Sequence, residues 1–198
     1  MLFKKIVILS FLCFVALLSL ALQPNNYLNM STNGEKYEGF TLTDYNGNKH
    51  SLYDYTESKA IVIMFIATQC PVSNAYNSRM EKIYKDYKDK EITFLGINSN
   101  KAEDVTEIRE HAEDNGLTFP ILKDERNIIA DKFAASYTPE IYVLSNKFEL
   151  LYHGRIDNSR RESEVNSKDL RNALDEILAG KKVSNPETKA FGCTIKRI

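Results

Sequence analysis

The stretch that most constrains the fold runs from residue 61 to residue 79. Residues 61–67 form an unbroken apolar run rich in β-branched side chains, which predicts a strand buried on both faces at the centre of a sheet. Apolar positions then recur at helical spacing, so we expect a helix over 71–89. Cys70 therefore lies between a buried strand and a helix N-terminus, with Pro71 at the first helical position, where its missing N–H costs nothing.

This position favours a thiolate at Cys70. Free N–H groups and the positive end of the helix dipole stabilise an anion at a helix N-terminus. We therefore expect the pKa of Cys70 to lie below that of a free cysteine, which would make it a nucleophile. The alternative is a buried cysteine that only fills space. The position of Cys70 and the strand before it both favour the nucleophile.

The first residues have the pattern of an export signal. Lys4 and Lys5 precede an apolar run over 6–22, and small residues stand at the −3 and −1 positions of a cleavage after residue 21. We expect a signal peptide over 1–21, with an uncleaved N-terminal membrane anchor as the alternative. The protein would then be exported, periplasmic or extracellular, with membrane contact only if this segment stays attached. Residues 22–38 are polar and rich in turn formers, which predicts a linker.

The cysteine count becomes informative once the signal is removed. Of the three cysteines, Cys13 would leave with the signal, so the exported chain keeps Cys70 and Cys193 in a compartment where disulfides persist. Either the two meet at some stage, or Cys193 is an incidental free thiol on a tail. We predict that they can pair.

Composition excludes some classes of function. With 26 basic and 27 acidic residues in 198, the chain suits one soluble domain with tails and gives no electrostatic argument for nucleic acid. The three histidines show no metal-ligand spacing with each other or with a second nearby cysteine, and the glycines form no phosphate loop. We expect no metal and no cofactor.

The order of the remaining elements predicts an α/β fold. Asn46-Gly47 favours an N-terminal β-hairpin ahead of the core, and Gly180 favours the C-terminal end of the last helix. We expect strands at 92–98, 141–145 and 149–153, a short extended piece at 119–122, and helices at 102–114, 127–133 and 167–178. The domain would span 39–180, and the tail, 181–198, carries Cys193. A βαβ unit followed by an antiparallel pair and a helix predicts a mixed central sheet with helices on both faces.

Several motifs together resemble one family. The chain is similar to the redoxin group of the thioredoxin superfamily, related to the alkyl hydroperoxide reductase and thiol-specific antioxidant (AhpC/TSA) proteins, over about residues 38–196. The matching pieces are Ala67-Thr-Gln-Cys-Pro-Val-Ser73, Phe119-Pro-Ile-Leu-Lys-Asp124, Thr138-Pro-Glu140, Tyr152-His-Gly-Arg-Ile-Asp157 and Gly192-Cys-Thr-Ile-Lys196. The resemblance implies a thioredoxin-like three-layer sandwich. It does not define one reaction, because one fold carries many functions.

The resemblance also implies site residues. In thioredoxin-like folds a cis-proline loop lies beside the attacking cysteine and binds extended substrate, and Thr138 and Pro139 match that loop. Thioredoxins have a second cysteine where this chain has Ser73, so the usual resolving thiol is absent. Three alternatives follow: Cys193 resolves, an external thiol resolves, or the site is redox-inert. Ser73 either donates a hydrogen bond to the Cys70 thiolate or is an ordinary polar residue of the first helical turn.

Peroxidase activity is less favoured by the residues. Peroxiredoxins have a threonine three residues before the attacking cysteine, and here Ala67 holds that position while Thr68 is one residue too close. Arg155 could support the thiolate, although a strand-end salt bridge is the interpretation we favour for it.

The leading hypothesis is an exported thiol–disulfide oxidoreductase in which Cys70 attacks and Cys193 resolves. A thiol-dependent peroxidase is the second hypothesis, and a redox-silent binding module that uses the cis-proline groove or the tail is the third. The expected partners are protein or small-molecule thiols and disulfides, together with an external thiol reductant.

Overall fold

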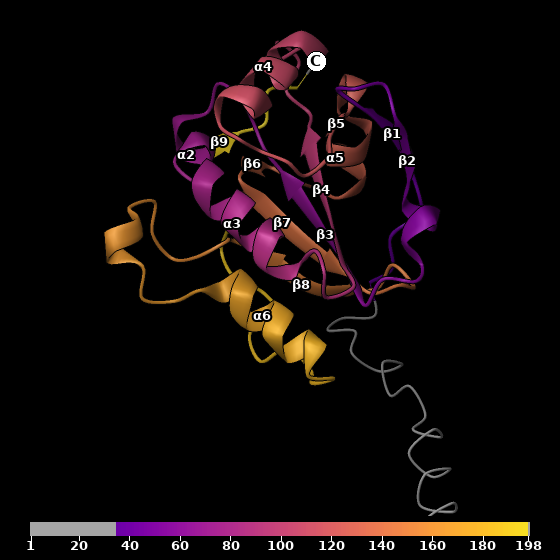
Figure 1. Cartoon of the computed structure of the whole chain (residues 1–198), viewed down its shortest axis with the longest axis vertical. Coiled ribbons are helices and arrows are strands. Elements are labelled where there is room, and N and C mark those ends of the chain that lie inside the picture. The colour runs from indigo at the N-terminus through magenta and orange to yellow at the C-terminus, as the bar shows by residue number, and fades with distance from the viewer. Residues whose placement is uncertain (1–34, 198) are drawn as a thin grey trace, which may run out of the picture.

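Strand β3 (Ala60–Phe65) lies in the interior of the main sheet, with a neighbouring strand on each side, as its uninterrupted apolar sequence predicts. The computed structural model describes residues 35–197, and every residue of β3 is buried in it (Figure 1). The signal peptide predicted over 1–21 lies outside the described residues. No helix within 35–197 is long and apolar enough to span a membrane.

Within the described residues 35–197 the main sheet is mixed, as predicted, and has seven strands. Their bounds, in spatial order, are β2 Lys49–Ser51, β1 Thr41–Asp44, β5 Ile121–Lys123, β4 Ile92–Asn98, β3, β7 Glu140–Leu144 and β8 Leu150–Gly154. The pairs of β3 with β4 and of β4 with β5 are parallel, and the other neighbours are antiparallel. The predicted hairpin is β1–β2, and its turn contains Gly47 at φ 87°.

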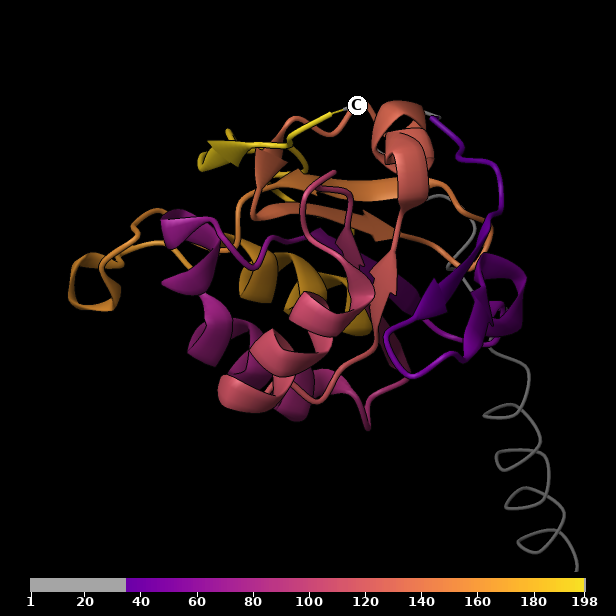
Figure 2. The ribbon, with the colours of Figure 1, turned by 90° about the horizontal axis from the view of Figure 1, so that it is seen from above.

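Alternate side chains of the buried strands feed two separate cores. In β3, Val62 and Met64 belong to the core under one layer of helices, whereas Ile63 and Phe65 belong to the core on the opposite face. The first layer contains α3 (Asn77–Tyr87), α4 (Val105–Asp114) and α6 (Asp169–Leu178), and the second contains α5 (Ile128–Lys132) and the 3-10 turn η2 (Leu52–Tyr55). This is the predicted thioredoxin-like three-layer arrangement (Figure 2).

The helix predicted over 71–89 is two helices in the structure. A single turn, α2 (Pro71–Asn74), ends before Tyr76, and α3 begins at Asn77. At this break the Tyr76 hydroxyl donates to Asp157 at 3.0 Å, and the Arg79 guanidinium donates to the Ala75 carbonyl at 3.2 Å. The helical spacing of apolar residues continues across this break, so the sequence does not reveal it.

The folded domain extends beyond both predicted boundaries. Residues 35–37 were expected in the linker, but Tyr37 is buried, stacks on Phe133 and donates its N–H to the Phe148 carbonyl at 2.9 Å. Residues 181–198 were expected to be a tail outside the domain, yet they contain β9 (Cys193–Thr194), which pairs with β6 (Tyr137–Thr138) in a second, two-stranded sheet. Figure 2 shows β9 beside β6 at one end of the molecule.

Candidate active site

Cys70 caps the first turn of α2. Its backbone is extended, and its Sγ accepts the Ser73 N–H at 3.3 Å, while Pro71 occupies the first helical turn as predicted. Only 4% of Cys70 is exposed, and Sγ lies 3.3 Å from the carbonyl oxygen of Thr138. Because α2 is only one turn long, its dipole is much weaker than that of the helix we predicted. The specific Ser73 N–H is therefore the main donor that this segment offers a thiolate.

The structure joins Cys70 to Cys193 by a disulfide. Their Cα atoms are 5.9 Å apart, although the residues are separated by 123 positions in the sequence. Cys193 is brought there by β9, in which Cys193 is opposite Thr138 and Thr194 is opposite Tyr137 in antiparallel register. The bond between Thr138 and Pro139 is cis, as the resemblance implied. The predicted attacking residue, the tail cysteine and the cis-proline loop thus form one site.

Two glutamates fix the loop that carries Cys70. Glu103 is 2% exposed, and its carboxylate accepts the N–H groups of Thr68 at 2.7 Å and Gln69 at 3.2 Å. Glu107, on α4, accepts the Thr68 hydroxyl and the Gln69 side-chain amide. The carboxylates of Glu103 and Glu107 therefore hold the loop that precedes Cys70 in place.

The buried carboxylate of Glu103 stays ionised because four donors surround it. Burial alone would raise its pKa, but the Thr68 and Gln69 N–H groups and the side-chain amides of Asn98 (2.5 Å) and Asn100 (2.7 Å) outweigh burial and lower the pKa. Asn100 also accepts the backbone N–H of Lys196 at 2.7 Å. One polar network thus connects the Cys70 loop to the tail just beyond Cys193.

Glu140 orders the other side of the site. This residue directly follows Pro139 and is 4% exposed, and its carboxylate accepts the N–H groups of Ser136 at 2.7 Å and Tyr137 at 2.8 Å. His153 adds a contact at 2.7 Å from Nε2. Burial raises the pKa of Glu140, but these partners more than compensate, and its pKa is lowered. An ionised carboxylate therefore keeps β6 extended beside the disulfide.

The remaining predicted residues have other partners. The Ser73 side chain is buried and its Oγ accepts the Ala67 N–H at 3.2 Å, so its backbone and not its hydroxyl contacts the Cys70 sulfur. The Thr68 hydroxyl donates to Glu107. Arg155 forms an ion pair with Asp169 at 2.7 Å, the strand-end salt bridge that we favoured. Within residues 35–197, no group of three or more potential ligands could hold a metal ion.

The sequence did not single out Glu103, Glu140 or Gly192 as site residues. A Cβ on Gly192 would lie 2.0 Å from the Thr138 carbonyl oxygen, so the tail passes directly over the cis-proline loop. The sequence position of each of these three residues gives a weak signal. Glu103 follows a polar segment at the end of a buried strand, Glu140 follows the Thr-Pro pair, and Gly192 precedes Cys193.

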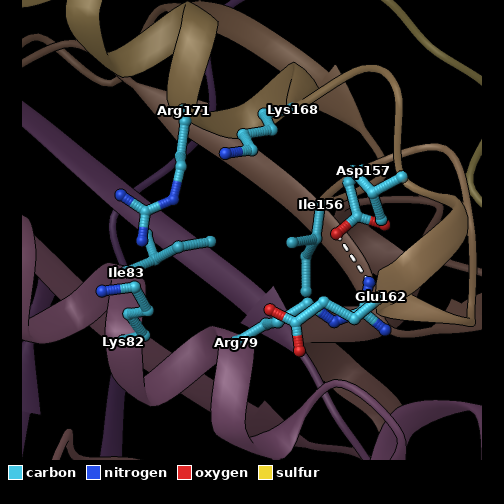
Figure 3. Close-up of a pocket in the computed structure, with 9 residues that line it drawn as sticks. Arg79, Lys82, Ile83, Ile156, Asp157, Glu162, Lys168 and Arg171 are labelled. Atoms are coloured by element: carbon cyan, nitrogen blue, oxygen red, sulfur yellow. Dashed lines mark hydrogen bonds and ion pairs between the residues drawn. The ribbon is translucent and has the colours of Figure 1, made fainter.

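A separate concavity of about 300 Å³ lies between α3, α6 and the loop before α6 (Figure 3). Four cationic residues line it, and neither cysteine does. Within it, Arg79 is engaged by Asp157 at 2.7 Å, and Arg171 pairs with Asp86 at 2.7 Å. Arg79 thus joins α3 to the loop after β8, and Arg171 joins α6 to α3, and we assign no chemistry to this pocket.

The fold and the site define a class: a thioredoxin-fold redoxin whose cysteine after β3 forms a disulfide beside a cis-proline. Comparison with known proteins gives the family. Residues 33–156 match the AhpC/TSA family, and the chain belongs to it.

Relatives in this family differ in the activity for which they are named. The chain is 36% identical over 115 residues to the thioredoxin-like protein YneN of Bacillus subtilis. This match covers 58% of this chain and 66% of YneN, slightly under two thirds of the relative's length. It is 26% identical over 146 residues to the thiol-disulfide oxidoreductase ResA of Halalkalibacterium halodurans, covering 71% and 81%. A putative peroxiredoxin of Mycobacterium tuberculosis is 29% identical over 111 residues, covering 56% and 69%.

Among solved structures, a hypothetical protein of Sinorhizobium meliloti 1021 is similar over most of its length. The TM-score is 0.79 at 30% identity, and the match covers 86% of this chain and 97% of that one. These similarities support an oxidoreductase of the thiol type. They do not distinguish disulfide exchange from peroxide reduction.

Proposed function

We propose that this protein is a thiol–disulfide oxidoreductase in which Cys70 attacks and Cys193 resolves. The observation that carries the proposal is the Cys70–Cys193 disulfide beside the cis-peptide before Pro139. A redox-silent binding module would not require two cysteines from segments 123 residues apart to meet at this point. The sequence adds that no second cysteine follows Cys70 within the helical turn, where Ser73 stands, so a resolving thiol has to come from elsewhere.

The proposed cycle transfers two electrons. In the reduced protein the Cys70 thiolate attacks one sulfur of a substrate disulfide, the substrate S–S bond breaks, and one substrate thiolate leaves. Cys193, as a thiolate, then attacks the Cys70 sulfur, breaks the mixed disulfide and releases the second substrate thiolate. The substrate is reduced to two thiols, and the protein is left with the Cys70–Cys193 disulfide. An external thiol reductant returns the two electrons.

The residues that surround Cys70 fit this chemistry. The Ser73 N–H donates to the Cys70 sulfur at 3.3 Å and would stabilise its thiolate. Thr138 and Pro139 offer the loop on which a substrate segment would lie. We further propose, from the signal pattern over 1–21, that the protein acts outside the cytoplasm, where protein disulfides are its substrates.

Peptide mapping of the reduced and mildly oxidised protein tests the proposal. The expected result is a Cys70–Cys193 cross-linked peptide after oxidation, disulfide-reducing activity on insulin in the reduced protein, and loss of that activity in Cys70→Ser. If Cys70 instead accumulates as an external adduct or a sulfinic acid while Cys193 stays open to alkylation, the resolving role of Cys193 is wrong.

Peroxide reduction is the second candidate, and the relationship to a putative peroxiredoxin favours it. There the Cys70 thiolate would attack a peroxide oxygen, give a sulfenic acid and release an alcohol or water, and Cys193 would then form the disulfide with loss of water. The surroundings of Cys70 favour disulfide exchange, because Ala67 stands at the threonine position and the Thr68 hydroxyl is engaged by Glu107.

A further inference from the structure

The tail forms a strand on the cis-proline loop. Residues Cys193–Thr194 pair antiparallel with Tyr137–Thr138, and the N–H of Ile195 donates to the Ser136 carbonyl at 3.0 Å. In the oxidised protein the edge of β6 is occupied by the chain's own C-terminal segment, β9 (Figures 1 and 2), and the disulfide joins this segment to Cys70.

The approach of this segment depends on glycine directly before the half-cystine. A Cβ on Gly192 would lie 2.0 Å from the Thr138 carbonyl oxygen, 2.7 Å from the carbonyl carbon and 3.4 Å from the Pro139 nitrogen. All three are backbone atoms, so no side-chain rotation relieves the clash. Any larger residue at this position would have to move the strand away from β6, and with it the sulfur of Cys193.

The edge of β6 stays extended even without contacts from the tail. The Glu140 carboxylate binds the N–H groups of Ser136 and Tyr137 from the other side of β6, and it is buried by the main domain. The Tyr142 hydroxyl, from the centre of β7, also donates to Glu140 at 3.2 Å. β6 would thus remain extended, and able to pair, after β9 leaves.

Contacts on both sides of Cys193 hold the tail at this edge. Beyond the cysteine, Arg197 binds Asp131 at 2.8 Å, and the Lys196 N–H binds the side chain of Asn100 at 2.7 Å. Before it, Phe191 contacts the Tyr76 ring edge-on, with centroids 6.3 Å apart. A peptide that uses the same edge has to displace this segment.

We infer that the edge of β6 is one docking strand with two mutually exclusive occupants: residues 191–195 in the oxidised protein, and in the reduced protein an extended peptide with glycine directly before its half-cystine. The inference rests on the proposed function and adds a substrate class to it. The Cys70 thiolate attacks the half-cystine sulfur of the docked peptide, whose disulfide partner leaves as a thiolate. After Cys193 breaks the mixed disulfide, strand 193–194 replaces the peptide.

Peptide selectivity tests the inference in reduced Cys193→Ser, which leaves Cys70 without its internal partner. The probes are the peptides Phe-Gly-Cys-Thr-Ile and Phe-Ala-Cys-Thr-Ile, each as a mixed disulfide with thionitrobenzoate, whose coloured thiolate leaves when Cys70 attacks the peptide sulfur. We expect the glycine peptide to react at least about tenfold faster, a difference of about 1.4 kcal/mol in the barrier. Equal rates would overturn the inference.

A small mixed disulfide of mercaptoethanol and thionitrobenzoate distinguishes failure of the inference from failure of the proposed function. It needs no docking strand, so its reaction with Cys70 reports on the proposed function alone. If it reacts while the two peptides do not differ, only the inference is wrong. If neither it nor the peptides react, both are wrong.

A substitution in the tail itself gives a second test of the inference. In Gly192→Ala, oxidation of the dithiol to the Cys70–Cys193 disulfide is expected to slow at least about tenfold, since the added methyl group meets the Thr138 backbone. Lys189→Ala, an exposed change on the same tail, is the matched control and should oxidise at the wild-type rate. Oxidation of Gly192→Ala at the rate of this control would contradict the inference, whatever the peptides do.

Discussion

Replacement of Glu103 by glutamine would test whether a buried carboxylate positions the Cys70 loop. In the structure this carboxylate accepts four hydrogen bonds, from Thr68, Gln69, Asn98 and Asn100, at 2.5 to 3.2 Å. A glutamine keeps one acceptor oxygen and turns an NH₂ group toward two donors, so two of the four bonds are lost. Hydrogen bonds to a buried charged group contribute about 1.5–3 kcal/mol each. We therefore expect a loss of roughly 3–6 kcal/mol in the free energy of unfolding at pH 7.

The pH dependence has a defined sign. The pKa of folded Glu103 is lowered, so its ionised form stabilises the fold above the unfolded-state pKa of about 4.5, and this stabilisation is lost as the pH falls through the folded pKa. The difference between wild type and Glu103→Gln should thus be largest at neutral pH and should shrink below about pH 4.5. Urea unfolding of the oxidised proteins from pH 3 to 8 measures it.

Glu107→Gln is the matched control, because Glu107 binds the same two loop residues but is only half-buried. We expect it to cost less than about 1 kcal/mol, as for other solvent-accessible polar contacts. The rate at which reduced Cys70 reacts with a small disulfide should fall in Glu103→Gln and change little in the control. If both variants unfold alike and keep the same rate, the positioning role of Glu103 is refuted.

Three further outcomes are expected. In reduced Cys193→Ser, the rate of iodoacetamide labelling against pH should give a pKa for Cys70 below the free value of about 8.5, because the Ser73 N–H favours the thiolate; a value at or above 8.5 would remove the basis for calling Cys70 a nucleophile. Disulfide exchange should exceed hydrogen peroxide consumption in assays with one common thiol reductant, and rapid peroxide turnover abolished by Cys70→Ser would reverse the order of the two candidate functions. Reduction should lower the free energy of unfolding by up to about 4–5 kcal/mol, since the disulfide closes a loop between positions 123 apart; unchanged denaturant midpoints for both forms would mean that the cross-link does not constrain the unfolded chain.

The sequence by itself determined the elements whose signals are local. The apolar run of β3 predicts a central strand because both of its faces are buried, and its alternate side chains enter two cores. Asn46-Gly47 predicts the hairpin because glycine accepts the positive φ of the turn. Pro71 predicts a helix start after Cys70, because its fixed φ suits the first helical position.

Only the tertiary structure decided which distant groups surround the cysteine. Thr68 and Glu103 are 35 positions apart, and Cys70 and Cys193 are 123 apart. No periodicity encodes such contacts, because they depend on how the strands order themselves in the sheet. The contact made by Tyr76 at the break before α3 is of the same kind: its hydroxyl donates to Asp157, a partner that is 81 residues away in the sequence and adjacent only after folding.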